Sequence, residues 1–167
     1  KCTKNITDFF GQDSSKSNSL ARIVNERHWD RIKSMVDENH GGKVVTPGVA
    51  QPNRADKFIP PTLVVDPSPT SRLMMEEIFG PVLPVVGVAN IDEALAIINS
   101  KEHSLASYIF TESKPLADKF VRETMSGGTC VSDCIFHIAN ANLPFGGIGS
   151  SGMGEYHGRA GFEEFSN

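Results

Sequence analysis

Residues 82–136 read VLPVVGVANIDEALAIINSKEHSLASYIFTESKPLADKFVRETMSGGTCVSDCIF, and in this stretch short apolar runs alternate with amphipathic segments. The apolar runs that fit buried strands lie at 83–88, 105–110 and 129–136. Asn90 can cap the first intervening helix, and the second begins near Pro115 and ends at Ser126-Gly127-Gly128. This alternation predicts an α/β fold, a parallel-type sheet with crossover helices.

The chain before residue 82 is less regular. Apolar residues recur at spacings of three and four after Asn25, which predicts a helix there. Prolines separate short apolar runs at 43–46 and 62–65, and proline cannot donate a sheet hydrogen bond, so short or edge strands are expected. No change of composition marks a boundary, and we expect one continuous unit over residues 1–167.

Charge and composition exclude several classes of protein. Sixteen Lys and Arg against twenty Asp and Glu give a net charge of -4, which excludes a strongly basic nucleic-acid binder. The apolar share, glycine included, is about 47%, which argues against disorder. No apolar run reaches the roughly 18 residues of a membrane span. Three cysteines are too few to stabilise a chain of this length by disulfides, so we expect reduced thiols in an intracellular, cytoplasm-like compartment.

A glycine-rich segment follows the last predicted strand. Residues 143–154 read LPFGGIGSSGMG, in which Gly147, Gly149 and Gly152 match the spacing of a dinucleotide-binding loop. That loop needs an acidic residue about 20 positions later, and only 15 residues follow Gly152. The residues alone favour a structural loop that uses glycine for positive φ and close packing. Because ligands of open parallel sheets bind beyond the strand ends, we expect a site within residues 137–154.

Cys130, Cys134 and His137 have a spacing that loosely suggests zinc ligation. Structural zinc sites take four ligands, only three are present here, and on a continuous strand His137 would face away from the two thiols. We therefore predict no metal site and expect both thiols to be buried. The sequence places no His or acid to activate either thiol as a nucleophile.

Residues 76–81 read EEIFGP and come just before a predicted strand. The two carboxylates could accept hydrogen bonds from sugar hydroxyls, and the aromatic ring that follows could form one wall of a site for a flat ring. The same pattern fits a helix end with two solvated acids, which is the commoner case for such residues taken alone.

Together these segments resemble aldehyde dehydrogenases. Residues 76–84, EEIFGPVLP, are similar to the stretch that carries that family's cofactor-contacting Glu and Phe. Residues 143–154 look like its C-terminal signature, in the form found in the class 3 and fatty aldehyde dehydrogenase branch. Other segments similar to that branch are Tyr156-His157-Gly158, Phe165-Ser166, FIPPTL at 58–63, Arg22-Ile23-Val24 and Arg27-His28.

The resemblance implies that residues 1–167 are a partial catalytic domain of an NAD- or NADP-dependent enzyme that oxidises an aldehyde to a carboxylate. In the family a Cys thiolate forms a thiohemiacetal, hydride passes to the nicotinamide, and a Glu-activated water hydrolyses the thioester. By similarity, Glu77 would hydrogen-bond the nicotinamide-side ribose, and Phe79 would pack near the nicotinamide. Four side chains would line an apolar path for aliphatic or aromatic aldehydes: Ile135, Ile138, Ala139 and Phe145.

The resemblance also implies what the sequence lacks. The family's nucleophilic Cys has a Gly-Gln-x-Cys context, which none of Cys2, Cys130 and Cys134 matches. That Cys, the general-base Glu and the Rossmann domain are expected upstream of Lys1, so the chain alone should be inactive. Family members are commonly homodimers. The alternative is a stand-alone, non-catalytic binding or assembly module derived from the dehydrogenase fold.

Two structural expectations follow from the resemblance. The 76–81 stretch and the glycine-rich segment should meet to form one wall of a pocket for the nicotinamide and the aldehyde. A partial domain should expose an apolar patch near Phe145 or on the outer face of the strands, and should self-associate. Ser132 and Ser150 replace Asn residues that are common in the branch, so hydrogen bonding there should differ.

Overall fold

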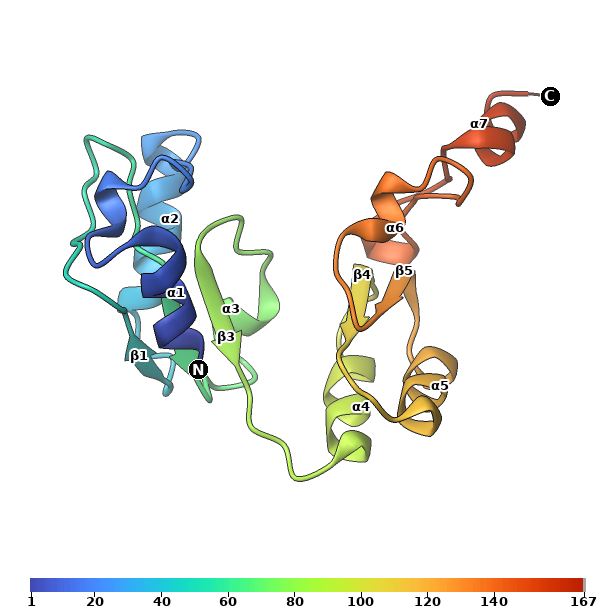
Figure 1. The fold of residues 1–167 in the computed structure, drawn as a ribbon, viewed down its shortest axis with the longest axis horizontal. Coiled ribbons are helices and arrows are strands. Elements are labelled where there is room, and N and C mark those ends of the chain that lie inside the picture. Colours follow the sequence, from blue (N-terminus) through green and yellow to red (C-terminus); the bar gives the residue numbers. More distant parts are fainter. Residues whose placement is uncertain (167) are drawn as a thin grey trace. The chain divides into compact units, whose positions relative to one another are not determined.

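The structure of the chain, a computed structural model, describes residues 1–166 and divides into two compact units, Lys1–Gly87 and Val88–Asn167 (Figure 1). The expectation of one continuous unit is corrected, because each unit has its own strands and its own buried core. Strand pairing is set by contacts between segments far apart in the chain, and composition does not reveal them.

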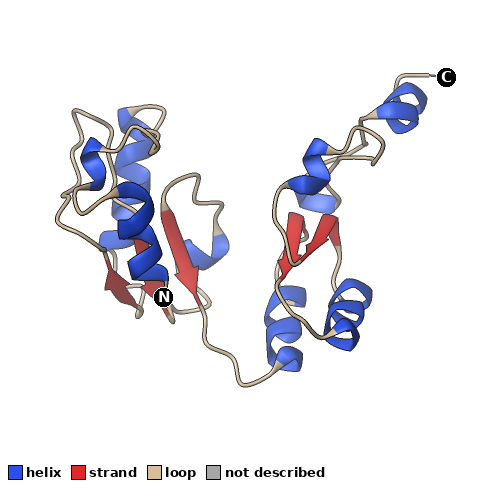
Figure 2. Ribbon diagram, viewed as in Figure 1, coloured by secondary structure: helices blue, strands red, loops and turns tan. Residues whose placement is uncertain are grey.

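The first unit packs helices on a three-stranded sheet (Figures 1 and 2). Strand β2 lies between β1, which is antiparallel to it, and β3, which is parallel. Helix α2 begins where predicted, since Asn25 Oδ1 accepts a hydrogen bond from the His28 amide at 2.9 Å. The elements are α1 (Cys2–Phe10), the 3-10 helix η1 (Ser14–Lys16), α2 (Glu26–Asp37), β1 (Lys43–Val45), β2 (Thr62–Val65), α3 (Arg72–Met75) and β3 (Val82–Val85). The buried core contains Ile23, Ile32, Met35, Ile59, Val64, Leu73 and Val82.

The second unit is built around the parallel pair β4–β5, which runs in register from Ser104 opposite Ser126 to Ile109 opposite Val131. Asn90 caps α4 as predicted, because its Oδ1 accepts from the Glu93 amide at 3.0 Å. Helix α6 lies at the end of the strands opposite to α4 and α5 (Figure 1). The elements are α4 (Ile91–Asn99), β4 (Ser104–Ile109), α5 (Lys114–Glu123), β5 (Ser126–Val131), α6 (Phe136–Ala139), the 3-10 helix η2 (Gly149–Ser151) and α7 (Gly158–Glu164). The buried core contains Leu95, Ile109 and Phe120.

The α/β class is confirmed, but two details of the predicted sheet are wrong. The three predicted strands do not form one sheet: β3 pairs with β2, and β4 and β5 pair with each other. Strand β5 also starts at Ser126, within the glycines read as a helix end, and stops at Val131. These glycines do not end a helix but serve close packing, because a Cβ on Gly127 would lie 2.0 Å from the Gly146 carbonyl oxygen. Glycine here lets the later loop approach the strand.

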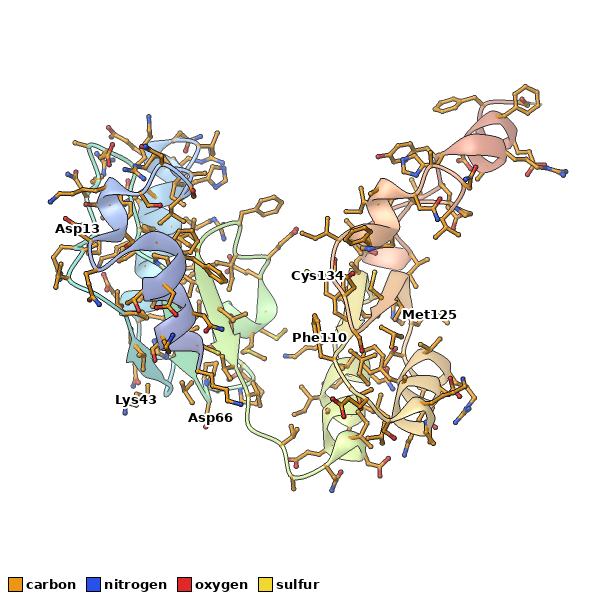
Figure 3. The ribbon with its side chains drawn as sticks, in the orientation of Figure 1. Asp13, Lys43, Asp66, Phe110, Met125 and Cys134 are labelled. Carbon is orange, nitrogen blue, oxygen red and sulfur yellow. The ribbon has the colours of Figure 1, made fainter. Side chains whose placement is uncertain are left out.

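Large apolar side chains are exposed in the second unit, among them Phe110 and Met125 (Figure 3). Phe145 itself is half-buried, while Met153, Tyr156 and Phe165, which line the same pocket, are exposed. Apolar surface is therefore present where it was expected. Within residues 1–166, no helix combines the length and the apolar character that crossing a bilayer requires.

Candidate functional site

The turn formed by residues 76–80, which we call the 76–80 turn, connects α3 to β3 and rests on helix α2. The Arg31 guanidinium donates to the Glu77 carbonyl at 3.2 Å and to the Ile78 carbonyl at 2.5 Å. A Cβ on Gly80 would lie 2.7 Å from Ile32 Cδ1, so glycine allows the turn to approach the helix closely. The turn is thus held at Glu77, Ile78 and Gly80.

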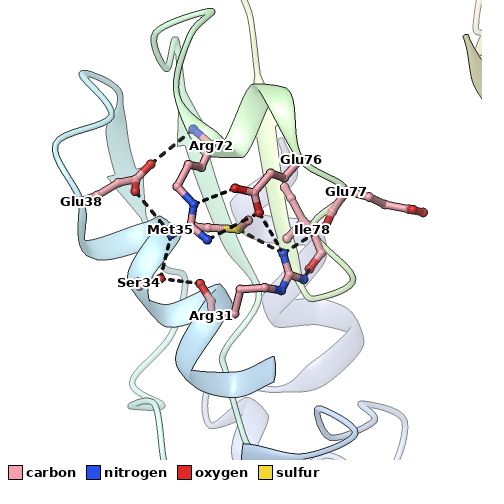
Figure 4. Close-up of polar contacts among 8 residues, drawn as sticks. All are labelled: Arg31, Ser34, Met35, Glu38, Arg72, Glu76, Glu77 and Ile78. Carbon is pink, nitrogen blue, oxygen red and sulfur yellow. Dashed lines mark hydrogen bonds and ion pairs between the residues drawn. The ribbon is translucent and has the colours of Figure 1, made fainter. Parts of the chain in front are cut away.

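The two neighbouring carboxylates have different surroundings (Figure 4). Glu76 accepts a hydrogen bond from Arg72 Nε at 2.8 Å and lies 3.6 Å from Arg31 Nη1. These cations, Arg72 foremost, hold the pKa of the Glu76 carboxyl below its usual value. The Glu77 side chain is exposed, takes no part in the ion pairs drawn, and points away from them. The helix-end interpretation therefore fits Glu76, whereas Glu77 presents its carboxylate outward.

Phe79 occupies an unusual backbone conformation. Its φ is 51°, in the left-handed region that bulky residues avoid, and 75% of its side chain is exposed. Such a conformation costs on the order of 1–3 kcal/mol and persists only where the surroundings enforce it. Here the enforcing contacts are those to Ile78 and Gly80 on either side. The chain keeps an aromatic ring at the surface at the expense of backbone strain.

The Phe79 ring borders a pocket of about 630 Å³ that lies wholly within the first unit. Arg22 is held at its edge, since Nε donates to Asp56 at 2.8 Å and the guanidinium lies 4.9 Å from the centre of the Phe58 ring. The lining is mostly apolar and comprises Leu20, Ala21, Arg22, Ile23, Val24, His28, Phe79, Gly80 and Pro81. A pocket of this size and character suits part of a small organic ligand.

The predicted apolar residues cluster around α6 in the second unit. Ile135 precedes the helix with φ 71° and 62% exposure, and Ile138 and Ala139, on the helix, are also exposed. Phe145 is linked to the helix through His137, whose ring centre lies 5.8 Å from that of Phe145. The structure therefore places these side chains in one region, after the end of β5.

Phe145 is fixed by a short backbone bridge as well as by ring contacts. Its amide and carbonyl exchange two 2.9 Å hydrogen bonds with Tyr156, and the two rings meet edge to face at 5.6 Å. His157 stacks on the same ring with a centre-to-centre distance of 6.0 Å. These contacts hold Phe145 where the two ends of the glycine-rich loop meet.

The glycine-rich loop is structural, as its residues alone indicated. Glycine allows close backbone packing, because a Cβ on Gly146 would lie 2.2 Å from the Gly154 carbonyl oxygen and one on Gly147 2.2 Å from that of Ser151. Gly154 also has φ 72°. The loop contains the 3-10 helix η2, and the next helix, α7, begins only at Gly158, whereas a dinucleotide fingerprint must itself open a helix. With Tyr156 and Phe165 it borders a second pocket of about 600 Å³.

The expectations for the cysteines are wrong in two respects. Cys134 is exposed, and Cys130 is half-buried (Figure 3 labels Cys134). Cys130 Sγ also lies 3.3 Å from His137 Nδ1, although a continuous strand would have kept them on opposite faces. Because β5 ends at Val131 and the chain turns at Ser132 with φ 57°, the imidazole folds back onto the thiol. Among the described residues no cluster of three or more His, Cys, Asp or Glu could hold a metal ion.

Arg31 was not predicted as a site residue, because no spacing or motif in the sequence singles it out. A signal for the neighbouring pocket was present, since Arg22-Ile23-Val24 and His28, which line it, belong to segments that resemble the branch. Ser132, where the resemblance led us to expect different hydrogen bonding, donates its hydroxyl to the Thr111 carbonyl at 3.1 Å. The two predicted groups of site residues lie in different units, and their meeting stays a prediction.

The comparisons with known proteins identify the family. The profile of the aldehyde dehydrogenase family matches residues 2–167. The chain is 42% identical over 170 residues to the dimeric NADP-preferring aldehyde dehydrogenase of Rattus norvegicus, covering all of this chain and 36% of that protein. It is 42% identical over 167 residues to aldehyde dehydrogenase family 3 member A2 of the same organism, again covering all of this chain and 34% of that protein.

Solved structures agree with the sequence matches. The substrate-bound AldH of Staphylococcus aureus aligns with a TM-score of 0.90 and 36% identity, over 99% of this chain and 35% of that one. The chain thus spans about a third of the length of these relatives. The chain belongs to the aldehyde dehydrogenase family and is a homologue of its class 3 members.

Proposed function

We propose that the chain is the later part of the catalytic domain of a longer aldehyde dehydrogenase that oxidises apolar aldehydes with NAD or NADP. In this proposal Glu77 accepts hydrogen bonds from the hydroxyls of the nicotinamide-side ribose, and Phe79 packs beside the nicotinamide. When bound, the nicotinamide accepts hydride from the substrate. The protein's part is to hold the ring in the orientation for transfer, an effect that can account for several kcal/mol of a barrier.

One observation carries the proposal: an outward-facing carboxylate stands two residues from a strained, exposed aromatic ring that borders an apolar pocket. Vicinal hydroxyls are donors that suit the free lone pairs of the Glu77 carboxylate. The flat nicotinamide ring suits a wall formed by Phe79. The chemistry of these residues therefore fits a nicotinamide nucleotide.

The apolar residues after β5 support the substrate class. Ile135, Ile138 and Ala139 expose hydrocarbon, and Phe145 adds an aromatic surface held by Tyr156. A lining of this kind favours aliphatic or aromatic aldehydes over sugars. One of the relatives named above, that of Rattus norvegicus, is called dimeric and NADP-preferring, and we extend a homodimer to the complete protein as part of the proposal.

The nucleophile and the general base are proposed to lie outside residues 1–167. The most direct check is the coding sequence before Lys1, which should contain Gly-Gln-x-Cys within a few tens of codons. A start codon next to Lys1 would instead favour the stand-alone module. The exposed rings of Phe162 and Phe165 favour the enzyme, because a stand-alone soluble module would be expected to have a more polar surface.

The activity test compares the complete protein with the chain alone. The complete protein should reduce NAD or NADP in the presence of a medium-chain aliphatic aldehyde or benzaldehyde, with kcat/KM at least about tenfold above that for a sugar aldehyde. The chain alone should give no turnover. Turnover by the chain, or no aldehyde-dependent reduction by the complete protein, would contradict the proposal.

A further inference from the structure

The contacts beneath the 76–80 turn single out Arg31, which has no role in the site proposed above. Its side chain is 24% exposed and lies on α2, 46 and 47 positions before the two residues whose carbonyls it binds. The same guanidinium lies 3.6 Å from the Glu76 carboxylate and 3.7 Å from Met35 Sδ. One side chain thus contacts Glu76, Glu77 and Ile78, directly before Phe79.

A second layer holds Glu76 from the other side (Figure 4). Arg72 donates from Nε to Glu76 and from Nη1 to Ser34 Oγ at 3.1 Å, and it lies 3.8 Å from the Glu38 carboxylate. Glu76 is therefore clamped between two arginines. The two adjacent carboxylates therefore differ in role: Glu76 holds the turn in place, and the Glu77 carboxylate remains available to a ligand.

We propose that Arg31 is a positioning residue that sets where Glu77 and Phe79 meet the nicotinamide nucleotide. The inference rests on the proposed function. Two hydrogen bonds from one planar guanidinium to neighbouring carbonyls fix the distance of the turn from α2 and its orientation. The contact of Gly80 with Ile32 fixes the other end of the turn. A lysine could keep the charge beside Glu76 but could not donate along both fixed directions.

The test uses Arg31→Lys in the complete protein, with Arg54→Lys as the matched control. Arg54 also forms ion pairs with α2, through Asp30 and Glu26, but it has no contact with the 76–80 turn among those described. Arg31→Lys should lower kcat/KM for the nucleotide about tenfold and leave KM for the aldehyde within about twofold. Arg54→Lys should leave both constants within about twofold. Unchanged nucleotide constants in Arg31→Lys would overturn the inference.

A double variant separates positioning from general damage. If Arg31 acts through Glu77, adding Arg31→Lys to Glu77→Gln should lower the nucleotide constant by less than about threefold more. A full further tenfold loss would show that Arg31 acts elsewhere and would overturn the inference. If Glu77→Gln alone changes nothing, the proposed function fails first and this inference with it. Should Arg31→Lys fail to fold, Glu76→Gln serves instead, with an expected loss of about threefold, and no loss would count against Arg31.

Discussion

At the scale of single residues, the most unusual feature of this chain is the conformation of Phe79. Phe79 keeps a left-handed backbone that glycine would adopt without strain, and its ring remains largely exposed. Neither feature stabilises the fold. Both are explained if the ring is needed at that position for a ligand.

Phe79→Gly tests that interpretation through stability. The substitution relieves strain and loses little buried surface, so the free energy of unfolding should stay the same or rise by up to about 1 kcal/mol. Urea unfolding followed by the fluorescence of Trp29, the single Trp, measures it. The control is Phe58→Ala, where a ring that is 1% exposed is lost, at an expected cost of about 3–5 kcal/mol. A loss above about 1 kcal/mol for Phe79→Gly would show that the ring packs in the fold.

The ion pairs of Glu76 predict how the stability of the fold depends on pH. Its pKa is lowered in the folded chain, chiefly by the hydrogen bond from Arg72, so its stabilising effect is complete above the pKa of an unfolded Glu, about 4.3. The effect is lost as the pH falls through the lower, folded pKa. The urea midpoint of the chain should exceed that of Glu76→Gln at pH 7, and the difference should shrink below about pH 4. A difference that is constant with pH would contradict this assignment.

At the scale of elements, the sequence predicted the parts that local rules control. Asn90 caps its helix as expected, α2 begins directly after Asn25 where a helix was predicted, and β2 occupies the predicted residues 62–65. The start of β5 was wrong because Gly127-Gly128 has the composition of a helix end. Glycine is present at these positions because a loop about 20 residues later packs against the strand. The partners of β3 were missed for the same reason, since pairing is a non-local property.

Gly127→Ala tests the close approach between β5 and the glycine-rich loop. The new Cβ would overlap the backbone of Gly146 and Leu105, so we expect a loss of more than about 2 kcal/mol, by far-UV circular dichroism in urea. Faster amide exchange in residues 143–156 should accompany the loss. The control, Gly161→Ala in α7, has only ordinary contacts and should stay within about 1 kcal/mol of the wild type. Equal effects of the two substitutions would refute the packing argument.

At the scale of the whole molecule, the family was recognisable from two motifs, but the site was only partly so. Glu77 and Phe79 were predicted as site residues from a family motif and stay a prediction, whereas Arg31, which binds their turn, was not predicted. A motif records residues that lie together in sequence, and Arg31 reaches the turn only through the fold. The Cys130–His137 contact was missed because the chain reverses at Ser132.

The exposed apolar side chains of the second unit predict self-association of the isolated chain. Phe162 and Phe165 are 74% and 90% exposed, and burial of such rings is favourable. Sedimentation velocity of the chain should show oligomers that grow with concentration, and the double variant Phe162→Ser, Phe165→Ser should reduce them without changing the circular dichroism. A monodisperse monomer over the whole concentration range would refute the expectation.

The proposed division of roles between the adjacent carboxylates is tested most directly by comparing Glu77→Gln with Glu76→Gln in the complete protein. The measurement is kcat/KM for NAD or NADP at saturating aldehyde, with the melting temperature recorded beside it. We expect Glu77→Gln to lose at least about tenfold with an unchanged melting temperature, and Glu76→Gln to lose about threefold with a lower one. Full activity of Glu77→Gln would contradict the assignment of this turn to the nicotinamide nucleotide.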